Sequence, residues 1–223
     1  MRVRKTLIYA AWLISSGAAY AATMAITEIE GGRRFDSFHS GSRGDVIGWD
    51  FKTDQSLAVR SVALWNDGAL NGDHRIGIWD ASGASVFSTT IGPRTARSGG
   101  DWWLSDVEGL TLGPGTYTIG ALYSFDDWDQ YLSGPSSIIL SDEIALIQSR
   151  FPSSPDLGFS FPQGRSATLG RFGPSFSFDT IASGTDSALA PVPAPASGLS
   201  LGGAIFGTFG LAAWQRRRWA ERT

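Results

Sequence analysis

Two acidic segments carry the side chains best suited to hold a hard cation. Asp126, Asp127 and Asp129 lie within four residues of one another, and a second group comprises Asp67, Asn71 and Asp73. Calcium prefers carboxylate and carbonyl oxygens on flexible loops. Neither spacing matches the EF-hand series, so the sequence leaves two interpretations open: a structural calcium at Asp126, Asp127 and Asp129, or simply solvated acidic loops. It implies no other cofactor.

Histidine chemistry has few residues to draw on. His39 and His74 are the two histidines of the chain, and it contains no cysteine. A zinc site normally needs three or four protein ligands, and a general base needs an oriented partner. We therefore expect His74 to be a hydrogen-bonded structural residue. The glycine-rich phosphate loops are also absent. The sequence predicts a protein that is not an enzyme.

A secreted polysaccharide hydrolase is the alternative from another class. Glycoside hydrolysis needs only two carboxyl groups about 5 to 9.5 Å apart. A pair drawn from Asp126, Asp127 or Glu143 would supply them. Their separation in space does not follow from the sequence, so this alternative stays open.

Aromatic side chains are the candidate ligand contacts. Trp128 and Tyr131 lie in and beside the acidic loop, and Trp102 and Trp103 are adjacent in an expected strand. Flat rings stack on the faces of sugars, while carboxylates bond their hydroxyl groups. Because neighbouring strand residues point to opposite faces, one of Trp102 and Trp103 is either covered by a loop or available to a ligand. We predict glycan binding by these four residues, against the alternative that they fill the core.

The elements that must position these residues are short strands. Apolar residues alternate with polar ones over 117–123, 75–80 and 175–178, which is the period of a half-buried strand. Asp80 to Gly83 has the residues of a type I turn, so 75–80 and 84–91 should form a hairpin. Further strands are expected at 24–30, 46–52, 57–65, 102–107, 137–140 and 167–172, and only 142–149 looks helical. The sequence predicts an all-β, antiparallel, jelly-roll-like β-sandwich over residues 22–182, with a closed barrel as the alternative.

The first 21 residues have the order of a secretory signal peptide. Arg2, Arg4 and Lys5 precede an apolar stretch, and Ala19 and Ala21 form an Ala-x-Ala cleavage site. Since there is no cysteine, neither disulfides nor a lipoprotein anchor can form. We expect export, with fold stability supplied by burial alone.

The C-terminal region reads as a sorting tail. Residues 183–195 form a Pro, Ala and Ser-rich linker, 196–214 are apolar or small, and 215–223 are basic. A helix of 19 residues is about 28 Å long, enough for a hydrocarbon core of roughly 30 Å. The arginines should hold the C-terminus in the cytoplasm. We expect a single transmembrane helix at 196–214.

This tail resembles the PEP-CTERM sorting domain of exopolysaccharide-producing Gram-negative bacteria. The resemblance rests on Val192, Pro193, Ala194 and Pro195, then the span, then Arg216, Arg217 and Arg218. Ala194 stands where the commonest motif has Glu. The resemblance implies a precursor held in the inner membrane, cleavage by an exosortase-type membrane protease, and a mature protein at the cell surface or in the extracellular matrix. An ordinary single-span anchor is the alternative.

The domain between the two ends is acidic and also resembles a known kind of domain. Removing the seven basic residues at the ends from the total of 18 leaves 11, and removing Glu221 from 21 acidic residues leaves 20. A nucleic-acid partner is not expected, because phosphate binding needs a basic face. Runs such as 48–51, 62–68, 73–80 and 173–176 resemble a β-sandwich domain of unassigned function in secreted PEP-CTERM proteins. The sequence therefore predicts an exported, non-enzymatic structural or glycan-binding protein, with exopolysaccharide as its expected partner.

Overall fold

The computed structural model describes residues 22–36, 43–65, 68–124 and 128–182. The expected signal peptide, linker, span and basic tail lie outside these residues, as do Asp67, Asp126 and Asp127. The described part is all-β, and its paired strands are antiparallel, in an arrangement consistent with the expected β-sandwich. No described segment forms a helix long and apolar enough to span a bilayer.

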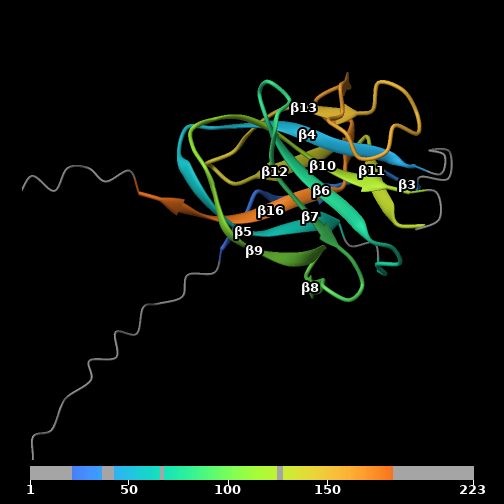
Figure 1. Cartoon of the computed structure of the whole chain (residues 1–223), viewed down its shortest axis with the longest axis horizontal. Helices are drawn as coiled ribbons and strands as arrows, with labels where there is room; N and C mark the ends of the chain where they lie inside the picture. Colours follow the sequence, from blue (N-terminus) through green and yellow to red (C-terminus); the bar gives the residue numbers. More distant parts are fainter. Residues whose placement is uncertain (1–21, 37–42, 66–67, 125–127, 183–223) are drawn as a thin grey trace, which may run out of the picture. The chain divides into compact units, whose positions relative to one another are not determined.

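Two larger sheets make up most of the domain (Figure 1). The five-stranded sheet has the order β1 (Thr23–Met24), β16 (Pro174–Ile181), β5 (Ser56–Trp65), β9 (Trp102–Leu112) and β8 (Arg97–Gly99). The six-stranded sheet has the order β14 (Gly164–Arg165), β13 (Ala145–Phe151), β4 (Asp45–Thr53), β10 (Gly115–Tyr123), β6 (His74–Asp80) and β7 (Ser85–Ile91).

Two smaller sheets complete the described fold. One pairs β15 (Arg171–Phe172), β11 (Gln130–Ser133) and β3 (Arg33–Asp36). The other pairs β12 (Ser137–Leu140) with β2 (Ile26–Glu30). Because β11 follows directly after Trp128 and Asp129, the first of these sheets positions the predicted ligand loop.

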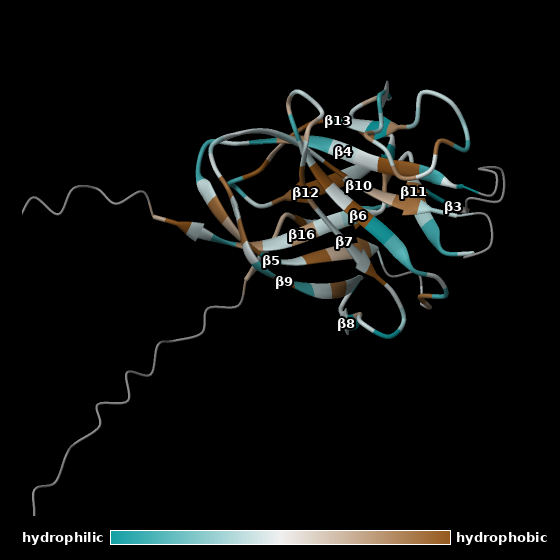
Figure 2. Cartoon of the chain, viewed as in Figure 1, coloured by the Kyte–Doolittle hydropathy of each residue, from teal (hydrophilic) through white to brown (hydrophobic). Residues whose placement is uncertain are grey.

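The core lies between the two larger sheets and is rich in aromatic rings. Trp49 and Phe51 on β4 pack against Phe176 on β16, with ring centroids 6.4 and 5.0 Å from that of Phe176, and all three are fully buried. The Trp49 indole N–H donates to the backbone oxygen of Pro174, 2.8 Å away, which joins the sheets by a buried hydrogen bond. Figure 2 shows hydrophobic and hydrophilic residues alternating along many strands, as expected for strands with one buried face.

The outer face of the six-stranded sheet carries a row of three glycines. Gly120 on β10 is in register with Gly48 on β4 and Gly77 on β6. A methyl group on Gly77 would lie 2.5 Å from the Trp79 ring, so that ring lies close over the sheet. Phe159 and Phe161, from the segment between β13 and β14, pack on Trp79 with centroid distances of 5.5 and 6.0 Å. An aromatic layer therefore covers part of this outer face.

Most strand predictions are confirmed, including the hairpin of β6 and β7. The helical reading of 142–149 is wrong, because 145–151 form β13 on the edge of β4. Eight residues are too few to form a helix without tertiary support, and here the tertiary partner is a strand. The predicted strand at 167–172 is reduced to Arg171–Phe172, since Ala167 instead accepts a hydrogen bond from the Ser149 hydroxyl.

Candidate functional site: a loop anchored by a buried histidine and aspartate

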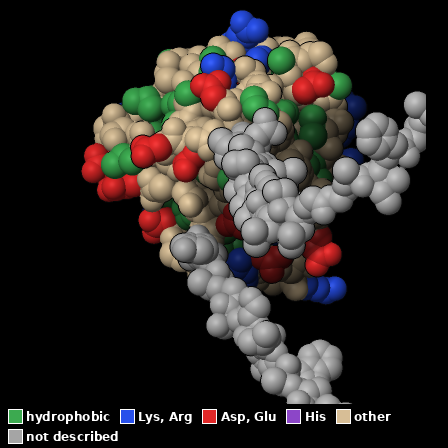
Figure 3. All heavy atoms as spheres, turned by 90° about the vertical axis from the view of Figure 1, so that its left-hand side faces the viewer, with side chains coloured by type: hydrophobic (Ala, Val, Ile, Leu, Met, Phe, Trp, Pro, Cys, Tyr) green, Lys and Arg blue, Asp and Glu red, His purple; other side chains and the backbone are tan. Residues whose placement is uncertain are grey.

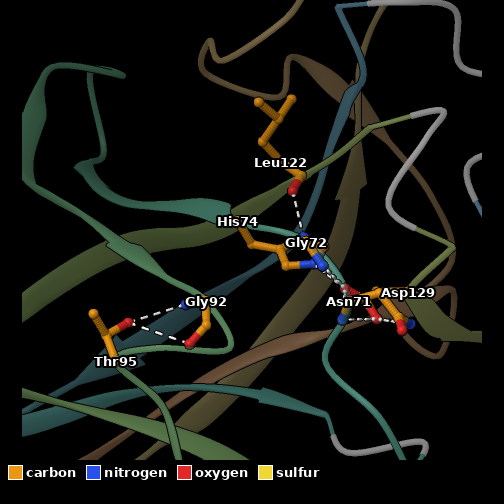
Figure 4. A network of polar contacts seen from close by, with 7 residues as sticks. All are labelled: Asn71, Gly72, His74, Gly92, Thr95, Leu122 and Asp129. Carbon is orange, nitrogen blue, oxygen red and sulfur yellow. Dashed lines mark hydrogen bonds and ion pairs between the residues drawn. The ribbon is translucent and has the colours of Figure 1, made fainter.

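His74 is fully buried at the start of β6 and bonds through both ring nitrogens (Figure 4). Its Nδ1 lies 2.8 Å from the backbone oxygen of Leu122 on β10. Its Nε2 lies 2.8 Å from Oδ2 of Asp129. The imidazole therefore links β6, β10 and the segment that enters β11.

The Asp129 carboxylate is 4% exposed and accepts hydrogen bonds from a second segment (Figure 4). The backbone N–H of Asn71 lies 2.9 Å from each carboxylate oxygen. The Asn71 side-chain amide and the Gly72 backbone N–H donate over 2.8 Å each. Asp129 thus fastens the loop before β6 to the loop before β11.

The geometry fixes where the protons of this pair lie. A backbone carbonyl only accepts, so Nδ1 of His74 carries a hydrogen. Nε2 faces a carboxylate oxygen, and one proton lies between the two groups. Burial raises the pKa of Asp129, but hydrogen bonds from His74, Gly72 and Asn71 outweigh it and hold that pKa below its ordinary value. The buried pair therefore carries a hydrogen on Nδ1 of His74 and a shared proton between Nε2 and Asp129.

This arrangement gives His74 a positioning role. Both nitrogens are occupied and the side chain has no exposed surface, so the ring has no free atom to offer a substrate. A general base must reach the proton that it removes. The bonds instead hold two loops at one end of the domain.

The residue next to this anchor has an unusual backbone. Trp128 has φ of 57°, in the left-handed region that non-glycine residues rarely adopt, and it is 59% exposed. Such a conformation costs on the order of 1–3 kcal/mol and persists only where neighbouring structure imposes it. The buried Asp129 directly follows it in the chain. The loop therefore directs one side chain inward and the adjacent ring into solvent.

A second exposed ring lies on the strand that pairs with β11. Phe35 on β3 is in register with Tyr131 on β11, and the rings stack with centroids 6.2 Å apart and planes at 22°. Phe35 is 47% exposed, whereas Tyr131 is buried against Tyr123. The small sheet therefore presents the exposed ring of Phe35, and its partner Tyr131 follows Trp128 by three residues.

The four predicted glycan-binding rings have different environments. Trp128 is exposed, Tyr131 is buried and stacks against Phe35, and Trp102 is in the core. Trp103 is half-buried against the core, and its enclosed indole N–H has no acceptor among the residues that the structure describes. Of the four, Trp128 is the ring placed to meet a ligand in solvent.

The calcium prediction remains open. Within the described ranges no three histidine or acidic side chains gather as metal ligands would. Asp126 and Asp127 lie outside those ranges, and the oxygens of Asp129 accept the N–H groups of Asn71, Gly72 and His74. The structure thus assigns Asp129 a role in joining loops that its sequence context did not indicate.

A second polar cluster, which the sequence analysis did not single out, lies on the outer face of the six-stranded sheet. Asp50 on β4 is 3% exposed and accepts hydrogen bonds from Thr118 at 2.6 Å, Gln148 at 2.6 Å and Arg150 Nε at 2.8 Å. Arg150 Nη2 lies 2.7 Å from its second oxygen. This buried ion pair forms the floor of a pocket of about 250 Å³. Glu143, named for the hydrolase alternative, is half-buried in the turn before β13.

Comparison with known proteins yields no relative from which a function could be transferred: no family model and no curated protein sequence matches the chain.

Proposed function

We propose that this chain is an exported, non-enzymatic protein of the cell surface or extracellular matrix that binds glycans through the loop end carrying Trp128. The observation that carries the proposal is the exposed ring of Trp128 in a left-handed backbone conformation beside the buried Asp129. Strained backbone conformations cluster at binding sites, and here the strained residue carries an exposed aromatic ring. Phe35 on the adjoining sheet supplies a second exposed ring.

Sugar rings fit such a surface for a physical reason. Exposed aromatic faces pack against the C–H faces of pyranose rings, and a rigid ring loses little conformational entropy on binding. The network of His74, Asp129 and Asn71 makes the loop rigid before ligand arrives. The proposed jelly-roll-like sandwich would then serve as a scaffold that presents this end.

The carboxylates of the outer pocket support binding over hydrolysis. The carboxylates that line the outer pocket, Asp50 and Asp80, each accept several hydrogen bonds from neighbouring residues. Bonds from Ser82 and then from backbone N–H groups hold the pKa of Asp80 below its ordinary value, despite an opposing effect of burial. A general acid for glycoside cleavage needs the opposite shift. On the face drawn in Figure 3, acidic and basic side chains are interspersed, with no basic patch suited to nucleic acid.

Localisation in this proposal rests on the two ends of the sequence. The signal peptide directs export, the span at 196–214 holds the precursor in the inner membrane, and an exosortase-type protease cuts near Val192 to Pro195. The intact mass of the protein recovered from the cell exterior tests both cleavages. Recovery of the full chain in soluble form from the cytoplasm would refute export.

Retention on extracted exopolysaccharide tests the binding site. We expect Trp128→Ala to weaken retention at least about fivefold, because truncating a central aromatic contact costs more than about 1 kcal/mol. Ile139→Ala removes a comparably exposed apolar side chain, 47% exposed on β12, and should bind as the wild type does. Equal retention of both variants and the wild type would refute the proposal.

A further inference from the structure

The pocket above the Asp50–Arg150 pair is a place for a second ligand. Thr118 on β10 and Gln148 on β13 are both in register with Asp50 on the strand between them. Three polar side chains therefore lie side by side across three strands, and the other lining residues include Asp80, Arg150, Phe161 and Arg165. The pocket lies at the Asp80 end of β6, about 20 Å along that strand from His74.

Two arginines line this pocket, and one of them has a counter-ion while the other does not. Arg165 on β14 is the direct cross-strand partner of Arg150 on β13, and both line the pocket. Like charges directly opposite each other destabilise an antiparallel pair. Asp50 neutralises Arg150, whereas the exposed Arg165 side chain has no ion pair or hydrogen bond within the described part of the chain. Arg165 is therefore the arginine of the pocket whose N–H groups are available to an anion.

Arg165 supplies the unused donors of the pocket. Asp50 accepts from Thr118, Gln148 and Arg150, so its oxygens have little capacity left. Asp80 turns one oxygen to Ser82 and Ala84 in its own turn. Arg165 retains its full fork of N–H groups, the geometry that binds a carboxylate through two parallel hydrogen bonds. At the Arg165 side of the pocket this geometry favours a carboxylate.

The apolar part of the rim limits the ligand further. Phe161 packs on the Arg150 guanidinium, whose central carbon lies 5.2 Å from the ring centre, and Ile147 is 42% exposed at the same pocket. These two residues offer a surface for C–H groups. A volume of about 250 Å³ is below the roughly 300–1,000 Å³ of drug-sized ligand sites, so it suits one small ring.

We propose that this pocket binds a single sugar ring bearing a carboxylate, a uronic acid residue, with Arg165 holding the carboxylate and Phe161 the ring. The site is separate from the Trp128 surface, and either site can exist without the other. If both bind glycan, the domain would contact an acidic polysaccharide at two points and gain avidity without new contacts.

Calorimetric titration of the full chain with glucuronate at low salt tests the proposal. We expect glucuronate to bind, and glucose, acetate and inorganic phosphate each to bind at least about tenfold more weakly, because each lacks the carboxylate or the ring. Equal binding of glucose removes the role of Arg165. Equal binding of acetate or phosphate removes the role of the ring. Either result overturns the proposal.

Matched arginine variants identify the residue responsible. Arg165→Ala should weaken glucuronate binding at least about tenfold, whereas Arg94→Ala, which removes an exposed arginine that is not among the pocket residues, should not. Arg165→Ala should also leave the thermal midpoint unchanged or raised, because a like-charge contact is lost. Unchanged glucuronate affinity in Arg165→Ala overturns the assignment. Trp128→Ala should retain glucuronate binding even if the Trp128 proposal fails.

Discussion

The Asp129 carboxylate provides the sharpest test of how the loop end is held. Asp129→Asn keeps the size of the side chain and removes its charge. The carboxylate accepts from Asn71 and Gly72 and faces Nε2 of His74, so it acts only as an acceptor. An asparagine has one acceptor oxygen and one donor NH₂ group.

Neither orientation of that asparagine satisfies the site. With NH₂ in the place of Oδ2 it meets the Gly72 N–H, which lies 2.8 Å from that position. With oxygen there, His74 must carry two hydrogens and a buried charge that has no counter-ion. One unsatisfied buried group costs about 1–3 kcal/mol, and a broken buried ion pair about 3–5 kcal/mol. We therefore expect Asp129→Asn to lower the free energy of unfolding by about 3 kcal/mol.

Urea unfolding followed by tryptophan fluorescence measures this loss, and Asp73→Asn is the matched control. Asp73 is exposed and directly precedes His74, so its substitution should change stability by less than about 0.5 kcal/mol. In the double variant with His74→Gln, the cost should fall clearly below the sum of the single costs, because each single change already breaks the shared contact. Additive costs, or a loss below about 0.5 kcal/mol in Asp129→Asn, would refute the buried ion pair.

Two further predictions concern acid stability and the outer face. The folded-state pKa of Asp129 lies below its ordinary value near 3.8, so its stabilising contribution is complete above that value and is lost as pH falls through the folded-state pKa. The thermal midpoint of the wild type should therefore fall more steeply below about pH 4 than that of Asp129→Asn. Parallel curves for the two proteins would contradict this. Gly77→Ala would place a methyl group 2.5 Å from Trp79 and 2.8 Å from Phe159, so overpacking should cost about 1–3 kcal/mol. Gly113→Ala meets no atom within 4 Å and should be nearly neutral in the same thermal melts; equal effects of the two would mean that Trp79 is not packed on the glycine row.

Local sequence patterns predicted most strands and turns, because these elements depend mainly on residues that are close in sequence. The Asp80 turn forms as expected, with Asp80 accepting from Ser82 and Ala84 and Gly83 at φ of 83°. The alternation at 117–123 predicted β10 within two residues of its start. The 142–149 segment failed because its strand conformation is imposed by pairing with β4, about 95 residues earlier.

Pairing between distant side chains was beyond the reach of sequence patterns. Asp129 was noted as acidic and His74 as a lone histidine, and 55 positions separate them. Asp50 and Arg150 are 100 positions apart, and neither stands in a motif. Burial near zero is rare for charged residues unless they are paired, but burial follows from the fold and not from local composition. One available signal was Asn71, which the sequence analysis grouped with acidic residues and whose side-chain amide does bond Asp129.

The two candidate sites differ in whether stability alone explains the residues around them. The His74–Asp129 pair stabilises two loops whether or not Trp128 binds anything, so its presence supports a rigid loop and leaves the ligand to the exposed ring. Arg165 is different, since it stands opposite Arg150, which is already paired with Asp50, and no described side chain pairs with Arg165 itself. An unpaired guanidinium beside a pocket suits an anionic ligand, whereas the buried pair of His74 and Asp129 needs none. For that reason the outer pocket, although absent from the sequence-based expectations, carries the more discriminating chemistry.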